Sequence, residues 1–177
     1  MFINQGHKLF YENFDHIPKE MCWYIAGFLD GEGYIGITKK ARPLKWRYFP
    51  YYYDPVIKVL NTNKQIIDIL EKYLGGYRFL RTFPERNQKD AHSLEWKSGS
   101  HILPMLKWLQ PYLIVKKSIC DLTIEFIEWK KKQGRYRAQK HRPFSEEEVR
   151  IMEDFHKRCL ELNHKGKLLP PTVAETK

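Results

Sequence analysis

The chain has 177 residues, of which 42% are hydrophobic and 15% aromatic, enough to build the core of one domain and to exclude wholesale disorder. Its 31 Lys and Arg residues against 21 Asp and Glu give a net charge of +10. That excess favours a polyanionic partner, nucleic acid before an anionic membrane, over the alternative of a basic protein with no such partner. The sequence has no CxxC spacing, no secretory signal and no apolar run near the roughly 18 residues that span a bilayer, so we expect an intracellular protein with no membrane partner.

Hydrophobic periodicity and cap residues predict the elements in chain order. Pro18 suits a first helical turn, and the helix that follows ends at about Asp30. The expected order is a helix over 19–30, strands from 33 and over 56–60, a helix over 64–74, strands over 77–83 and 92–98, and helices over 98–110, 115–134 and 145–162. Pro43, Pro50 and Pro55 predict a loop or hairpin tip between the first two strands, because proline cannot sit in a central ladder.

This order is αββαββα followed by a C-terminal extension. Two separate antiparallel hairpins indicate an α+β fold with a four-stranded antiparallel sheet, not a doubly wound one. We expect three parts: an N-terminal extension over 1–18, a core over 19–142, and a C-terminal helix and tail over 143–177. Ser145 and Glu148 have the spacing of a capping box at the start of the last helix, which we expect to brace the outer flank of the sheet.

The stretch YIAGFLDGEGYIGI at 24–37 is unusual for its glycines. Tyr24, Gly27 and Gly31 are spaced by three and four residues, so they share one stripe of the first helix. A stripe of small residues lets another helix backbone approach closely. Since the chain has one such helix, its natural partner is the same helix of a second copy across a two-fold axis, which predicts a homodimer.

Two acids, Asp30 and Glu32, lie where this helix ends. A two-fold axis between paired helices would bring both copies of Glu32 together, and two close carboxylates repel unless a cation lies between them. Mg²⁺ takes oxygen ligands: one or two carboxylates, water and phosphate. The residues therefore predict a divalent-metal site at the dimer axis, with a phosphodiester as the remaining ligand.

The segment IAGFLDGEG at 25–33 resembles the signature of the LAGLIDADG homing endonucleases, with Ile for the first Leu and Glu for the last Asp. The resemblance implies an intron-encoded nuclease whose single motif makes it a homodimer of αββαββα protomers. It also implies that the four-stranded sheet forms a saddle over the DNA major groove. By the same resemblance Glu32 and the Gly31 carbonyl bind the catalytic metal, Mg²⁺, with Mn²⁺ as a substitute and Ca²⁺ binding without supporting cleavage.

Two further catalytic residues follow from the resemblance. The phrase LQPYLIVKKS resembles the family's segment before the penultimate helix, which places a lysine near the active site. That lysine is Lys116, with Lys117 as the alternative. Asn61, at the end of the second strand, matches a polar residue that positions solvent, although it is equally suited to capping the next helix. Asp30 is expected to support the helix end, not to bind metal.

DNA recognition should come from alternate strand residues that face away from the core, because Arg or Lys pairs with guanine and Glu with cytosine. The expected DNA-binding residues are Thr38, Lys40, Arg42, Lys58, Arg78, Arg81, Ser93, Glu95, Lys97 and Lys117. Arg78 and Arg81 cannot both face outward by simple alternation, so one of them is expected to contact phosphate. The basic cluster from Lys130 to Arg142 is a further candidate for backbone contacts.

Together these patterns predict a site-specific double-strand endonuclease that hydrolyses phosphodiesters at a long, pseudo-palindromic DNA target. The alternative is a non-cleaving protein on the same fold, a maturase that binds intron RNA or a regulator that binds DNA. The presence of both Glu32 and Lys116 favours the nuclease, because a pure binding protein needs neither at this place.

Overall fold

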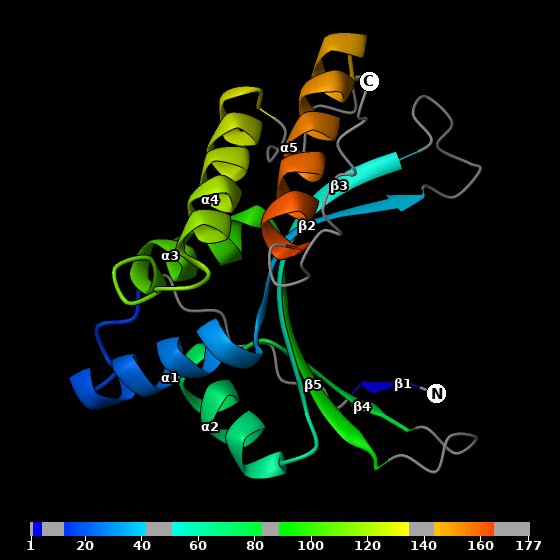
Figure 1. Cartoon of the computed structure of the whole chain (residues 1–177). Helices are drawn as coiled ribbons and strands as arrows, with labels where there is room; N and C mark the ends of the chain where they lie inside the picture. The colour runs from blue at the N-terminus through cyan, green and yellow to red at the C-terminus, as the bar shows by residue number, and fades with distance from the viewer. Residues whose placement is uncertain (1, 5–12, 42–50, 83–88, 135–143, 165–177) are drawn as a thin grey trace, which may run out of the picture.

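The computed structural model of the chain describes residues 2–4, 13–41, 51–82, 89–134 and 144–164. Within these ranges the elements follow the predicted order, preceded by a short strand (Figure 1). In chain order they are β1 (Phe2–Asn4), α1 (Lys19–Glu32), β2 (Tyr34–Ala41), β3 (Tyr51–Asn61), α2 (Lys64–Leu74), β4 (Tyr77–Arg81), β5 (Ala91–Lys97), α3 (Gly99–Leu109), α4 (Lys117–Lys132) and α5 (Glu146–His164). The α+β class and the αββαββα core are confirmed.

The strands form one antiparallel sheet in the order β1-β4-β5-β3-β2. The four expected strands are present, and β1 adds a fifth at the outer edge of β4, where Phe2 pairs with Arg81. The sequence did not indicate this strand, since three residues are too few to show a period. The sheet is twisted and curved, and the helices lie on one side of it (Figure 1).

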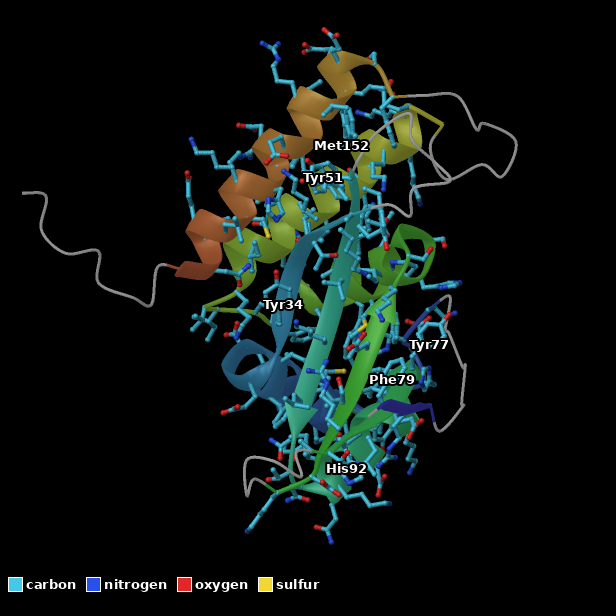
Figure 2. All side chains as sticks on the ribbon, turned by 90° about the vertical axis from the view of Figure 1, so that its right-hand side faces the viewer. Tyr34, Tyr51, Tyr77, Phe79, His92 and Met152 are labelled. Carbon is cyan, nitrogen blue, oxygen red and sulfur yellow. The ribbon has the colours of Figure 1, made fainter. Side chains whose placement is uncertain are left out.

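The core lies between the helices and one face of the sheet. Ile25 and Leu29 of α1 are fully buried, as are Ile57 of β3 and Leu94 of β5. Trp96 of β5 anchors α2, because its indole N–H donates to the Leu74 carbonyl over 3.0 Å. The opposite face of β3, β4 and β5 is not covered by any helix among the described residues (Figure 2).

The loop predicted for residues 42–55 is wrong for its last five residues. β3 already begins at Tyr51, and Pro55 pairs with Ile37 of β2 inside the strand. Proline is tolerated there because β5 pairs with β3 only from Val56 onward. Pro55 therefore lies where β3 has a neighbour on one side only, so its missing N–H interrupts no ladder.

Helix α5 covers the free edge of β2 and packs beside α4 (Figures 1 and 2). The Ile37 N–H donates to the Cys159 sulfur over 3.1 Å, and the Asn163 amide donates to the Ile35 carbonyl over 3.3 Å. Lys39 reaches Glu153 of α5 with an N–O distance of 2.8 Å. An unpaired strand edge invites association with other chains, and here a helix covers it, which fits the bracing role expected for this segment.

The predicted capping box at the start of α5 is confirmed. The Glu148 N–H donates to the Ser145 hydroxyl over 3.1 Å, and the Ser145 N–H donates to the Glu148 carboxylate over 2.8 Å. None of the described helices is both long and apolar enough to span a membrane.

We expect Ser145→Ala to lower the free energy of unfolding by about 1 kcal/mol, because the helix loses one side-chain cap. Chemical denaturation followed by circular dichroism measures the change. Ser118→Ala, which replaces an exposed serine in the first turn of α4, is the control and should change stability less. Equal stability of the wild type and Ser145→Ala would show that the box contributes nothing.

Candidate functional site

Helix α1 presents one buried and one exposed stripe. Cys22, Ile25, Ala26 and Leu29 face the core. The opposite stripe is exposed and consists of Glu20, Trp23, Tyr24, Gly27 and Gly31. A Cβ atom added at Gly27 or Gly31 would meet no atom of the protomer within 4 Å. Packing inside the protomer therefore does not require glycine at either position.

The carboxylate of Asp30 ties the end of α1 to the segment before α4. Three successive backbone N–H groups donate to it, from Ile114, Val115 and Lys116, with N–O distances of 3.0, 2.8 and 2.6 Å. Burial opposes ionisation of Asp30, but these hydrogen bonds and the nearby Lys116 ammonium outweigh it and lower its pKa. Asp30 thus has the supporting role expected from the sequence.

This tie places the Lys116 side chain over the C-terminal end of α1. Its ammonium donates to the Asp30 carbonyl and lies 3.3 Å from the Gly31 carbonyl oxygen. A cation is favoured there because the carbonyl end of a helix carries partial negative charge. Burial lowers the Lys116 pKa, although Asp30 and Glu32 act in the opposite direction. The lysine predicted from LQPYLIVKKS therefore lies beside the Gly31 carbonyl, one of the two predicted metal ligands, and Glu32 is the residue after Gly31.

Glu32 is the last residue of α1 and its side chain is exposed. The next residue, Gly33, is constrained by the protomer itself, because an added Cβ would lie 2.6 Å from the Leu29 carbonyl oxygen. Backbone packing thus sets the point at which the chain leaves α1 and enters β2. Glu32 is held at that corner, next to Gly31.

The oxygens at this corner suit a hard divalent cation. The Glu32 carboxylate and the Gly31 carbonyl are ligands of the kind that Mg²⁺ and Ca²⁺ take. Among the described residues no three His, Cys, Asp or Glu side chains are grouped as a metal site. The metal-binding role of Glu32 and Gly31 stays a prediction.

Asn61 ends β3, and its side chain forms a turn instead of capping α2. Its carbonyl oxygen accepts from the Asn63 N–H over 2.8 Å, while Asn63 caps α2 by accepting from the Gln65 N–H over 2.9 Å. Lys58 pairs with Tyr34, so Asn61 lies three residues, or roughly 10 Å, further along β3 than the start of β2. The solvent-positioning role of Asn61 stays a prediction.

The open face of the sheet carries most of the predicted DNA-binding residues. Strand alternation and register assign to it Thr38, Lys40, Lys58, Arg81, Ser93, Glu95 and Lys97. Tyr34, Tyr77 and Phe79 share this face, and the sequence prediction did not include them although aromatic residues on alternate strand positions were a signal. Lys117 begins α4 and is exposed, and Arg42 lies outside the described residues.

The prediction that Arg78 binds DNA is wrong, because this residue lies on the helix-covered face and is only 7% exposed. Its guanidinium is 2.6 Å from an Asp68 oxygen and 2.8 Å from a Glu71 oxygen of α2. Arg78 therefore joins β4 to α2, and Arg81 is the arginine on the open face. Ser93 also differs from expectation, since it is buried between its larger cross-strand neighbours Leu60 and Phe79.

The basic cluster predicted to contact the DNA backbone begins with a buried residue. Lys130 donates to the Tyr53 carbonyl over 2.8 Å and lies 3.5 Å from an Asp54 oxygen, so it joins α4 to β3. Lys131 and Lys132 are exposed at the end of α4, and residues 135–142 lie outside the described ranges.

The sequence prediction missed an apolar pair beside the site. Ile114 and Val115 are 86% and 79% exposed, although their backbone is fixed by Asp30. The signal was the apolar run LIV directly before the two lysines. Held at the end of α1, this pair adds apolar surface close to the exposed stripe of that helix.

No protein-family model matches the sequence, and no curated protein is similar to it. Solved structures do match in shape. The homing endonuclease I-CvuI, in complex with DNA, aligns with a TM-score of 0.53 and 21% identity over 82% of this chain and 96% of its own. The homing endonuclease I-TnaI aligns with a TM-score of 0.57 and 15% identity over 81% and 96% of the two chains.

A third similar structure is the intron-encoded homing endonuclease I-CeuI in complex with DNA, with a TM-score of 0.55 and 15% identity over 68% of this chain and 60% of its own. The LAGLIDADG homing endonuclease I-GzeII, also bound to its DNA target, aligns with a TM-score of 0.54, but this chain covers 42% of it. These similarities, together with the αββαββα order and the glycine-lined α1, show that the chain has the LAGLIDADG homing endonuclease fold.

Proposed function

We propose that the protein is a site-specific double-strand DNA endonuclease that acts as a homodimer and depends on a divalent cation, Mg²⁺ in the first place. One observation carries the proposal. The Lys116 ammonium lies 3.3 Å from the Gly31 carbonyl oxygen at the end of α1, Glu32 is the next residue, and the exposed glycine stripe ends at the same place.

Each residue of the corner has a distinct task. Glu32 and the Gly31 carbonyl hold the cation. When bound, such a cation supplies a nucleophilic water and stabilises negative charge on phosphate. Lys116 adds a positive charge beside the phosphate and orders water near it. Asp30 fixes the backbone that carries Lys116, and two protomers supply one such corner for each DNA strand.

The open face supports DNA as the substrate. Lys40, Lys58, Arg81 and Lys97 give it a basic character, and their side chains extend from strands that fit a major groove. A strand of eight residues spans roughly 26 Å, the length of about eight base pairs at 3.4 Å each. Two such faces related by a two-fold axis predict a long pseudo-palindromic target.

The similar structures support both the substrate and the cation. I-CvuI was solved with DNA in the presence of Mg in one case and of Ca in another, and I-CeuI and I-GzeII were solved with DNA. The alternative of a non-cleaving DNA- or RNA-binding protein shares the open basic face. A non-cleaving protein, however, would not need both Glu32 and Lys116 at the end of α1.

Incubation of the protein with Mg²⁺ and a randomised DNA duplex library, followed by sequencing of the cut ends, tests the proposal. We expect paired cuts on both strands at related sequences, lost when EDTA removes the cation. Mn²⁺ should restore cutting, and Ca²⁺ should restore binding alone. Sequence enrichment without any cut ends would favour the binding protein, and enrichment of an RNA library alone would favour a maturase.

Asp30→Ala should lower the cleavage rate roughly tenfold to hundredfold, because the segment that carries Lys116 loses its anchor and small displacements of catalytic groups are costly. DNA affinity should change little, since the open face is untouched. Single-turnover cleavage and DNA-binding titrations measure the two effects. Asp121→Ala, which removes an exposed acid paired with Lys117 of α4, is the control. Unchanged cleavage by Asp30→Ala would show that Lys116 needs no such anchor.

A further inference from the structure

Glu95 is the one acid among the residues that the sequence assigned to DNA contacts, and its surroundings differ from those of a base-reading side chain. It is only 9% exposed, although it lies on the open face of β5. One carboxylate oxygen is 2.5 Å from the Lys97 ammonium, and the other is 3.3 Å from the Arg81 guanidinium. Both oxygens therefore already have a cationic partner within the protomer.

The strand register places a third cation beside the same carboxylate. Lys58 of β3 is directly opposite Glu95, and Tyr77 of β4 is opposite it on the other side. Burial alone would raise the Glu95 pKa, but Lys97, Arg81 and Lys58 reverse this and lower it. Glu95 is thus ionised at neutral pH, and one negative charge lies among three positive ones.

Aromatic rings fix the directions of the surrounding cations. The Lys97 ammonium lies 5.3 Å from the centre of the Phe79 ring, and the Lys58 ammonium lies 4.7 Å from the centre of the Tyr34 ring. Such cation–π contacts hold a flexible lysine against one neighbour. Phe79 and Tyr77 mark the region of the open face where Glu95 lies (Figure 2).

We propose that Glu95 determines DNA sequence selectivity indirectly, as a positioning residue that holds Lys97 and Arg81 in one orientation and cancels one positive charge on the open face. The proposal rests on the DNA-binding function proposed above. It differs from the expectation that Glu95 reads cytosine, because the buried carboxylate is occupied by its own chain.

Two physical consequences follow from this arrangement. Lysine and arginine side chains held in fixed directions contact base edges in one geometry. Mobile side chains can instead contact the nearest phosphate, whatever the base sequence. The cancelled charge also weakens attraction to phosphate, which is the sequence-independent part of DNA binding. Glu95 therefore lowers affinity for arbitrary DNA while it sharpens affinity for the target.

Binding experiments in Ca²⁺, which is expected to support binding without cleavage, test the proposal with two probes: one duplex of arbitrary sequence and one randomised duplex library. For Glu95→Gln we expect about tenfold tighter binding to the arbitrary duplex and a salt dependence steeper by about two units for a dimer, since the loss of one negative charge from each protomer lets one more cation per protomer neutralise a phosphate. The library selected by this variant should lose sequence information at one pair of symmetry-related positions.

Glu128→Gln is the matched control, because Glu128 is a partly exposed acid on α4 that pairs with Lys107. It removes the same charge away from the open face and should leave both probes unchanged. Glu95→Asp is the second variant and covers the case in which Glu95→Gln does not fold. It keeps the charge with a shorter arm, so it should retain wild-type affinity for the arbitrary duplex while losing information at the same positions.

Three outcomes separate this inference from the proposed function. If the wild-type protein selects a sequence and Glu95→Gln selects the same sequence as sharply, the inference is overturned and the proposed function remains. If Glu95→Gln loses only a preference for cytosine and binds the arbitrary duplex with unchanged affinity, Glu95 reads the base directly. That outcome would also overturn the inference. Wild-type protein that selects no sequence would overturn the proposed function itself.

Discussion

Replacement of Glu32 by Gln is expected to lower DNA cleavage by about a thousandfold or more, because loss of a cation-binding carboxylate removes several kcal/mol of transition-state stabilisation. Binding to the target should be largely retained, since Glu32 lies at the end of α1 and not on the strands of the open face. The substitution preserves the size of the side chain and removes only its charge. Single-turnover cleavage in Mg²⁺, alongside a binding titration in Ca²⁺, separates the two effects.

Glu128→Gln removes the same charge on the helix side and should cleave at the wild-type rate, which makes it the control for altered net charge. Lys116→Met gives an independent check of the corner, because it leaves the carboxylate in place and should lower the cleavage rate while retaining Mg²⁺ dependence. If Glu32→Gln nicks DNA at the normal rate, the assignment of the metal site to this corner is wrong.

Much of the fold could be predicted from sequence because its signals are local. The change from helical to alternating periodicity near Gly33 places the junction of α1 and β2, and the capping box of Ser145 and Glu148 places the start of α5. Pro55 was misjudged because the rule against proline in a strand depends on the neighbouring strand. The residues around Pro55 do not indicate that β5 pairs with β3 only from Val56 onward.

The site was predicted only in part, because its contacts join residues far apart in the chain. Alternation shows that Arg78 and Arg81 face opposite ways, but the choice between them depends on Asp68 and Glu71 of α2. The tie between Asp30 and the N–H groups of residues 114–116 spans more than eighty residues and leaves no local pattern. A resemblance can place Lys116 near the site, but only the folded chain shows what holds it there.

Substitution of Gly27 gives the strongest test of the dimer, because a larger side chain there should be tolerated by a monomer and should disrupt a dimer. A Cβ atom added at Gly27 meets nothing within 4 Å inside the protomer, so the protomer leaves the position open. Within an exposed helix, alanine or leucine is favoured over glycine by up to about 1 kcal/mol. A protein that works as a monomer should therefore tolerate Gly27→Leu and become slightly more stable.

If two α1 helices meet along this stripe, close backbone approach leaves no room for the new side chain. We then expect the series Gly27→Ala, Gly27→Val and Gly27→Leu to show progressive loss of dimer by analytical ultracentrifugation. Double-strand cleavage should fall in parallel, since each protomer supplies one catalytic corner. The free energy of unfolding of the dissociated protomer should not fall, which distinguishes lost assembly from lost folding.

Gly33 supplies the opposite control, since an added Cβ there would lie 2.6 Å from the Leu29 carbonyl oxygen of the same protomer. Gly33→Ala should destabilise the protomer itself, so that unfolding and loss of cleavage go together. The contrast between the two glycines assigns one to the fold and the other to assembly. A Gly27→Leu protein that stays dimeric and cuts both strands would show that α1 does not form the interface, and the cation site would then have to be completed within one protomer.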